Sequence, residues 1–125
     1  MKTGEEIYRA ALALLFEDDS TAGDYRSYAR PLLNILLSEC FEANNSLREA
    51  AGKEPLIAAT ELKALEEETG YEDVLCVRVL PYGLAAKLVL DDGDMGKVSM
   101  FQSLYTNALN ECVKWLPEDV KDVYV

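Results

Sequence analysis

The side chains best able to do chemistry in this sequence are aspartates gathered in one short turn. Asp91, Asp92 and Asp94 supply the carboxylate oxygens that a divalent cation prefers. A calcium loop of the EF-hand type also needs a bidentate glutamate at its twelfth position. Counted from Asp91 or from Asp92, that position falls on Gln102 or Ser103. The spacing therefore predicts a turn that caps the next helix, and no metal site.

Three cysteines are the next candidates, and the lack of histidine decides how they are interpreted. The sequence contains Cys40, Cys76 and Cys112 and no histidine. A thiolate nucleophile normally needs a histidine or another cation beside it, and zinc sites commonly use histidine as a ligand. An odd number of cysteines without a C-x-x-C motif favours reduced thiols that pack as small apolar residues. We therefore expect no catalytic residue, no cofactor and no enzymatic activity.

Acidic side chains also gather in two other stretches. Asp18 and Asp19 lie in a polar loop, and together with Asp24 they are candidates for a carboxylate pair in acid–base catalysis. Such a pair needs a pocket that separates the two pKa values, which a solvated loop does not offer. Residues 66–68 are three successive glutamates, a pattern typical of a solvated surface. The functional alternative for this run is docking to a basic protein surface.

The aromatic residues recur at helical spacing and are predicted to lie mainly in the core. Two of them, Tyr8 and Trp115, lie near expected helix ends and are the ones most readily assigned to an interface. Those assigned to the core, with a ligand pocket or an interface as the alternative, are Tyr25, Tyr28, Tyr82 and Tyr105.

Length and charge limit the possible partners. A chain of 125 residues is expected to form one domain. Its net charge of −11, from 12 basic and 23 acidic residues, disfavours direct binding to nucleic acid or to an anionic membrane. The N-terminal residues do not resemble a signal peptide, and no apolar run reaches the roughly 20 residues that span a bilayer. We therefore expect a cytosolic protein.

Hydrophobic periodicity predicts an all-α fold, a small bundle of four main helices. Thr3 and Glu6 form a capping box at the start of the first helix, and Asp24 and Asp94 are N-cap candidates for two others. We expect a helical domain over residues 1–117 and a C-terminal tail over 118–125. The expected helices cover residues 3–16, 24–51, 72–90 and 94–116, with a short one at 60–65.

The expected third helix, residues 72–90, is apolar nearly all round and should be buried. Pro81 should kink it, and Gly83 predicts a close approach of another helix. A buried strand over residues 74–80 is the competing interpretation, because this stretch is rich in valine. Pro31 raises a similar question in the second helix, which it either kinks or begins.

A resemblance to a known family rests on four sets of residues. These are the opening Thr-Gly-Glu-Glu-Ile-Tyr (3–8), Asn-Ile-Leu-Leu (34–37), Leu-Pro-Tyr-Gly-Leu-Ala (80–85) with Asp-Gly-Asp (92–94), and Phe101, Tyr105 and Asn107. With these residues the chain resembles head–tail connector, or adaptor, proteins of tailed bacteriophages and of prophages in Gram-positive bacteria. The resemblance spans most of the chain.

The resemblance implies a structural protein that assembles into rings with copies of itself and contacts the phage portal and tail proteins. It implies a location in the host cytoplasm during assembly and in the virion afterwards, with residues 53–70 and the tail as docking arms. The alternative function is an acidic helical module that occupies a basic protein surface. The interface residues predicted on these grounds are Asp18, Asp19, Glu66, Glu67, Glu68, Trp115, Val120, Val123 and Tyr124.

Overall fold

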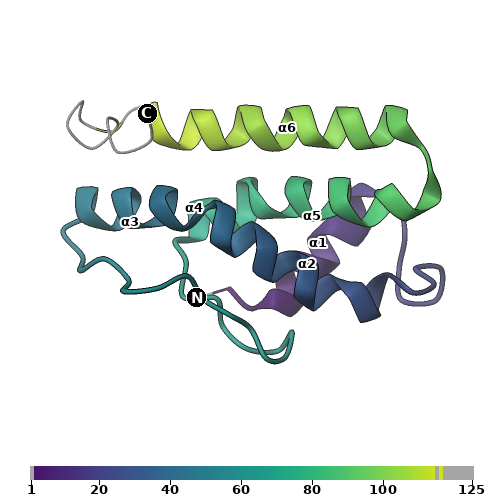
Figure 1. Cartoon of the computed structure of the whole chain (residues 1–125), viewed down its shortest axis with the longest axis horizontal. Coiled ribbons are helices and arrows are strands. Elements are labelled where there is room, and N and C mark those ends of the chain that lie inside the picture. Colours follow the sequence, from purple (N-terminus) through teal and green to yellow (C-terminus); the bar gives the residue numbers. More distant parts are fainter. Residues whose placement is uncertain (1, 115, 117–125) are drawn as a thin grey trace.

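A computed structural model describes residues 2–114 and residue 116. Within these residues the chain forms six α-helices and one 3-10 helix, so the expected all-α class is confirmed there (Figure 1). Where four main helices were expected, two of the long ones are divided. The elements are α1 (Gly4–Leu14), α2 (Tyr25–Glu39), α3 (Phe41–Ala50), α4 (Asp73–Arg78), α5 (Leu80–Leu88), η1 (Val89–Asp92) and α6 (Met95–Val113).

Helix α5 is the central element of the packing. Its most extensive contacts are with α6, which runs along one side of the molecule in Figure 1, and with α1 and α2. Seven of its nine residues are buried, and only Tyr82 and Lys87 are partly exposed. A Cβ on Gly83 would lie 2.7 Å from Leu36 Cδ2 and 2.9 Å from Tyr105 Cδ1. The close helix approach expected at this glycine is therefore confirmed.

The expected helix over 72–90 is interrupted one residue before Leu80, so Pro81 does not sit inside it. Val79 has φ −116° and ψ −56° and separates α4 from α5. Pro81 then lies in the first turn of α5, where a missing N–H costs no helical hydrogen bond. The alternative of a strand over 74–80 is wrong, because residues 73–78 are helical.

The expected helix over 24–51 is also two helices, and Pro31 is not the point of division. Pro31 lies inside α2 with an exposed ring, so water can solvate the carbonyl that its missing N–H leaves unpaired. The break comes at Cys40, with φ −96° and ψ 8°. Its N–H still donates to the Leu36 carbonyl, and its carbonyl still accepts from the Asn44 N–H, both at 2.9 Å. The chain therefore bends at Cys40 with most of its hydrogen bonding kept.

Three smaller expectations about the helices also change. Helix α1 ends at Leu14 rather than at Phe16, which adopts a left-handed φ of 57°. The short helix expected over 60–65 is absent, and the hydroxyl of Thr60, at its expected start, donates to the Thr69 carbonyl at 2.6 Å. Helix α6 ends at Val113, three residues before the expected end. The N-cap at Thr3 is confirmed, with the Glu6 N–H donating to the Thr3 hydroxyl at 3.2 Å. The other half of the expected capping box differs, because the Glu6 carboxylate accepts from the Thr3 hydroxyl, at 3.5 Å, in place of the Thr3 N–H.

Asparagine side chains hold the long segment between α3 and α4 against the helices. The Asn34 amide donates to the Leu62 carbonyl at 3.0 Å and accepts from the Leu62 N–H at 2.8 Å. Asn45 makes the same pair of bonds to Leu56, at 2.9 and 2.8 Å. Asn44 accepts from the N–H of Glu72 at 2.7 Å. These side chains take the place of a neighbouring strand, so the segment is fixed without secondary structure of its own.

Candidate functional site

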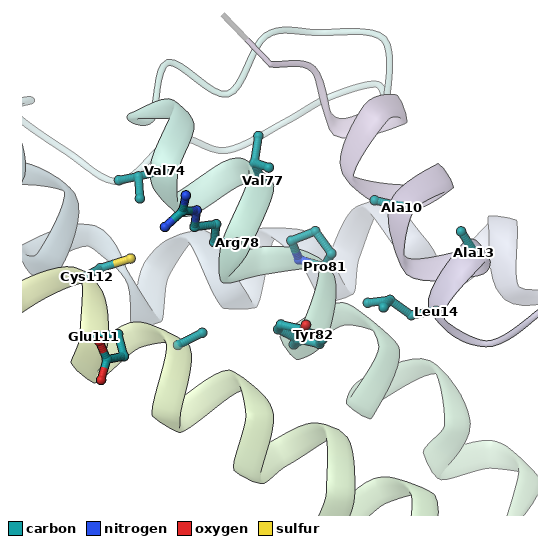
Figure 2. Close-up of a pocket in the computed structure, with 11 residues that line it drawn as sticks. Ala10, Ala13, Leu14, Val74, Val77, Arg78, Pro81, Tyr82, Glu111 and Cys112 are labelled. Atoms are coloured by element: carbon teal, nitrogen blue, oxygen red, sulfur yellow. The ribbon is translucent and has the colours of Figure 1, made fainter.

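An open apolar cleft of about 750 Å³ lies where four helices meet. Helices α4 and α5 form its floor, α1 forms one wall, and the last turns of α6 form the other (Figure 2). The floor exists because the chain changes direction at Val79, between the two short helices. The residues that line it are Ala10, Ala13, Leu14, Val74, Val77, Arg78, Pro81, Tyr82, Ala108, Glu111 and Cys112.

Small and half-exposed side chains keep the cleft open. Ala10 and Ala13 on α1 are exposed, and a methyl group is too short to fill the space above them. Val77 is 57% exposed, although valine belongs to the residue types most often found inside proteins. Such an apolar recess on a folded surface is typical of a site that binds another apolar surface.

One cation faces the cleft without a partner in the described residues. Arg78 makes no ion pair or hydrogen bond with any of them. Figure 2 shows its side chain on the α4 side, facing the end of α6 that carries Cys112. The pKa of Cys112 is raised by burial, and the nearby guanidinium of Arg78 opposes part of this rise. The cleft thus combines an apolar lining with two charged side chains, Arg78 and Glu111. Because Glu111 is paired with Lys114 at 3.1 Å, Arg78 is the charge available to a bound anionic group.

The buried thiols have the properties of core residues rather than of nucleophiles. Cys40 and Cys76 are 0% and 2% exposed. Burial raises the pKa of Cys40 to about 11 and raises that of Cys76 as well. A nucleophilic cysteine requires the opposite shift, because the thiolate is the reactive form. These two thiols therefore pack as expected, whereas Cys112 is only partly buried.

The predicted interface residues of the first acidic loop are engaged in contacts within the molecule. Asp18 accepts hydrogen bonds from the hydroxyl and the N–H of Ser20, and these bonds lower its pKa. Asp19 lies 3.2 Å from Arg9 Nη2 and 3.6 Å from Arg26 Nη1. The loop is thereby tied to α1 and α2. Asp19 would have to exchange these partners to bind a basic surface.

The three glutamates at positions 66–68 differ in their contacts. Glu67 accepts hydrogen bonds from the N–H groups of Lys63 and Ala64, at 2.6 and 3.3 Å, and the bonds lower its pKa. Glu68 forms an isolated antiparallel bridge with Thr3, and its side chain is exposed, as is that of Glu66. The three glutamates therefore do not act as one uniform patch.

The aspartate turn forms the cap that was expected. The Asp94 carboxylate accepts the N–H of Lys97 at 3.1 Å and so caps α6. Asp92 accepts a hydrogen bond from the Tyr25 hydroxyl. In the part of the chain that the structure describes, no group of three or more acidic or cysteine side chains is arranged to hold a metal ion.

Tyr8, one of the two aromatic residues most readily assigned to an interface, lies in the core. It is 0% exposed, because α1 turns this side chain inward. The Arg26 guanidinium lies over its ring, 5.4 Å from the ring centroid. Four of the predicted interface residues, Trp115, Val120, Val123 and Tyr124, lie outside the described residues, as does the expected tail over 118–125.

The cleft was not predicted from the sequence. Its lining comes from four helices, and the expected single helix over 72–90 hid the change of direction that creates the floor. One available signal was the alanine at positions 10 and 13, which leaves a gap beside the apolar face of α1.

Across residues 2–114 and 116, no helix is both long enough and apolar enough to cross a membrane. Comparison of the chain with models of protein families, with curated proteins and with solved structures gives no match.

Proposed function

We propose that this chain is a non-enzymatic structural adaptor that joins other proteins, and that it serves as a head–tail connector of a tailed phage or prophage. The observation that carries the adaptor role is the open apolar cleft. Its lining is suited to holding an apolar segment of a partner, and Arg78 adds an attraction for an acidic group. The phage assignment rests on the sequence resemblance described above.

The size of the cleft agrees with this role. A recess of about 750 Å³ lies within the range of pockets that bury most of a small ligand or of a few side chains. Helix-in-groove recognition uses such a recess to take anchor side chains from one face of an amphipathic helix. A portal or tail protein that presents such a helix is therefore the partner we expect. Self-association into a ring belongs to the same proposal.

The experiment measures molar mass in solution by light scattering over a concentration series, for the chain alone and mixed with portal and tail proteins of the same gene cluster. We expect a discrete ring or a defined complex with a portal-like protein. Replacing Val77, which is 57% exposed, by Asp places a charge in the cleft without opening the core. The Val77→Asp variant should lose the complex and keep its helical circular dichroism spectrum.

Ile57 offers the matched control. It is 100% exposed and lies in the segment between α3 and α4, outside the cleft. The Ile57→Asp variant should therefore assemble like the unmodified chain. A monomer at every concentration and in every mixture would contradict the connector role. Equal assembly by the Val77→Asp variant would contradict the use of the cleft.

A further inference from the structure

We propose that residues 117–125 of the same molecule occupy the apolar cleft when no partner is bound. The inference goes beyond the proposed function, because it concerns the free protein and holds whatever the partner is. A partner that docks in the cleft would then have to displace this segment.

The first argument is where the segment leaves the described structure. Helix α6 ends at Val113, directly after Cys112, which lines the cleft. Beyond it, the N–H of Leu116 donates to the Val113 carbonyl at 3.1 Å, and the next residue in the sequence is a proline, which commonly follows the end of a helix. The segment therefore starts beside one wall of the cleft.

The second argument is length. Nine extended residues reach about 30 Å, at roughly 3.3 Å each. Even as one straight helix, without the change of direction at Val79, the floor between Val74 and Tyr82 would rise by only about 12 Å, at 1.5 Å per residue. The segment is thus long enough to turn back from the end of α6 and run along the floor of the cleft.

The third argument is chemical complementarity. The cleft offers an apolar lining and two charged side chains, Glu111, which is paired with Lys114 at 3.1 Å, and Arg78, whose side chain has no ion pair among the described residues. The segment supplies apolar side chains for the lining and carboxylates for the guanidinium. The apolar residues are Val120, Val123, Tyr124 and Val125, and the acidic residues are Glu118, Asp119 and Asp122.

The segment of the same molecule is favoured over that of a second copy as the occupant of the cleft, because its effective concentration is higher. A segment joined to its site by a short linker has an effective concentration in the millimolar range. A second copy must reach a comparable concentration to compete, so the intramolecular contact dominates in dilute solution.

The test measures how fast N-ethylmaleimide modifies Cys112 in the folded protein. If the segment covers the cleft, the double variant Val123→Ser and Tyr124→Ser should be modified severalfold faster than the unmodified chain. This variant keeps the net charge, so any change in rate does not come from an altered electrostatic effect on the thiolate. Mass spectrometry assigns each modified site. Cys40 and Cys76, which are 0% and 2% exposed, report any general unfolding.

The control and the opposing results are defined by the same measurement. The Ile57→Ser variant changes an apolar residue that is 100% exposed and does not line the cleft, and it should react at the unmodified rate. Equal rates for the double variant and the unmodified chain would overturn the proposal. A rate in the unmodified chain that falls as protein concentration rises would also overturn it, because a second copy would then be the occupant.

Discussion

At the scale of single residues, a small network that runs from the buried Cys40 and Tyr105 to the exposed Glu39 joins three helices. The Cys40 sulfur lies 3.3 Å from the Tyr105 hydroxyl, which donates to Glu39 Oε1 at 2.8 Å. Glu39 in turn lies 3.4 Å from Lys87 Nζ. The network links α2, α5 and α6 at the point where α2 gives way to α3. Each member is neutral or paired, which is what burial requires of polar groups.

This network predicts how stability depends on pH. The pKa of Cys40 is raised from 9.0 to about 11 in the folded chain, mainly by burial. The unfolded thiol therefore loses its proton first as the pH rises, so this part of the stability is complete below pH 9 and is lost toward pH 11. A shift of this size corresponds to about 3 kcal/mol. Between pH 9 and pH 11, the free energy of unfolding of the Cys40→Ala variant should fall less than that of the unmodified chain, and the two falls should differ by roughly 2–3 kcal/mol.

Urea denaturation at about pH 8 and about pH 11 measures this difference. The Cys112→Ala variant is the comparison, because the Cys112 thiol is only partly buried. Between these two pH values, its free energy of unfolding should fall nearly as much as that of the unmodified chain. If the loss in the Cys40→Ala variant equals that of the unmodified chain, the folded thiol ionises as readily as the unfolded one.

At the scale of elements, the approach of three helices depends on a glycine. A Cβ on Gly83 would lie within 3 Å of Leu36 and Tyr105, which belong to α2 and α6. Overpacking of this kind costs about 1–3 kcal/mol, whereas the gain in helix propensity is about 1 kcal/mol. The Gly83→Ala variant should therefore be less stable than the unmodified chain by up to about 2 kcal/mol, as measured by chemical denaturation.

Gly96 is the matched glycine in α6. A Cβ at this position would meet only Asp94 Oδ1, at 3.4 Å. The Gly96→Ala variant should be as stable as the unmodified chain, or up to about 1 kcal/mol more stable. A Gly83→Ala variant as stable as Gly96→Ala would show that α2 and α6 separate from α5 at little cost.

The asparagine contacts predict a local effect in the segment between α3 and α4. The Asn34→Ala variant leaves the N–H of Leu62 without its partner, and it leaves the Leu62 carbonyl with Arg30 Nη1, at 3.2 Å, as its remaining donor. Loss of such partly buried bonds should lower the free energy of unfolding by about 1–3 kcal/mol. It should also speed proteolytic cleavage near the exposed residues 66–68. Limited proteolysis followed by mass spectrometry measures both the rate and the site.

Asn107 provides the control for this measurement. It is exposed on α6, and its side chain has no hydrogen bond in the described part of the chain. Cleavage of the Asn107→Ala variant should follow the pattern of the unmodified chain. The same pattern in Asn34→Ala would mean that other contacts hold the segment.

At the scale of the whole molecule, net charge competes with individual ion pairs. Nine ion pairs connect described residues, most of them exposed, and such pairs contribute about 0–1 kcal/mol each. The net charge of −11 opposes compaction through general repulsion. Because the surface pairs are weak, we expect repulsion to be the larger effect.

Salt should therefore stabilise the protein at neutral pH. Raising the NaCl concentration from about 0.01 M to about 0.1 M shortens the screening length from about 30 Å to about 10 Å. The Tm should rise over this range in calorimetric scans. Near pH 4.3, where the net charge is zero, the rise should vanish or reverse. A fall in Tm at neutral pH would mean that the ion pairs outweigh the repulsion.

Local patterns in the sequence were sufficient for much of the fold. The helical class, the Thr3 and Asp94 caps and the close approach at Gly83 follow from residue types within a few positions of each other. Capping, helical periodicity and steric limits act over one or two turns, so they are readable from the sequence alone.

The tertiary structure alone decided where helices divide and what lies between them. The break at Cys40, the separation of α4 from α5 and the burial of Tyr8 depend on which surfaces pack together. The asparagine contacts to Leu56 and Leu62 join residues 11 and 28 positions apart. The cleft draws its lining from helices α1, α4, α5 and α6, which are distant in sequence. Packing over such separations adds the energies of many weak contacts, and no local pattern carries that sum.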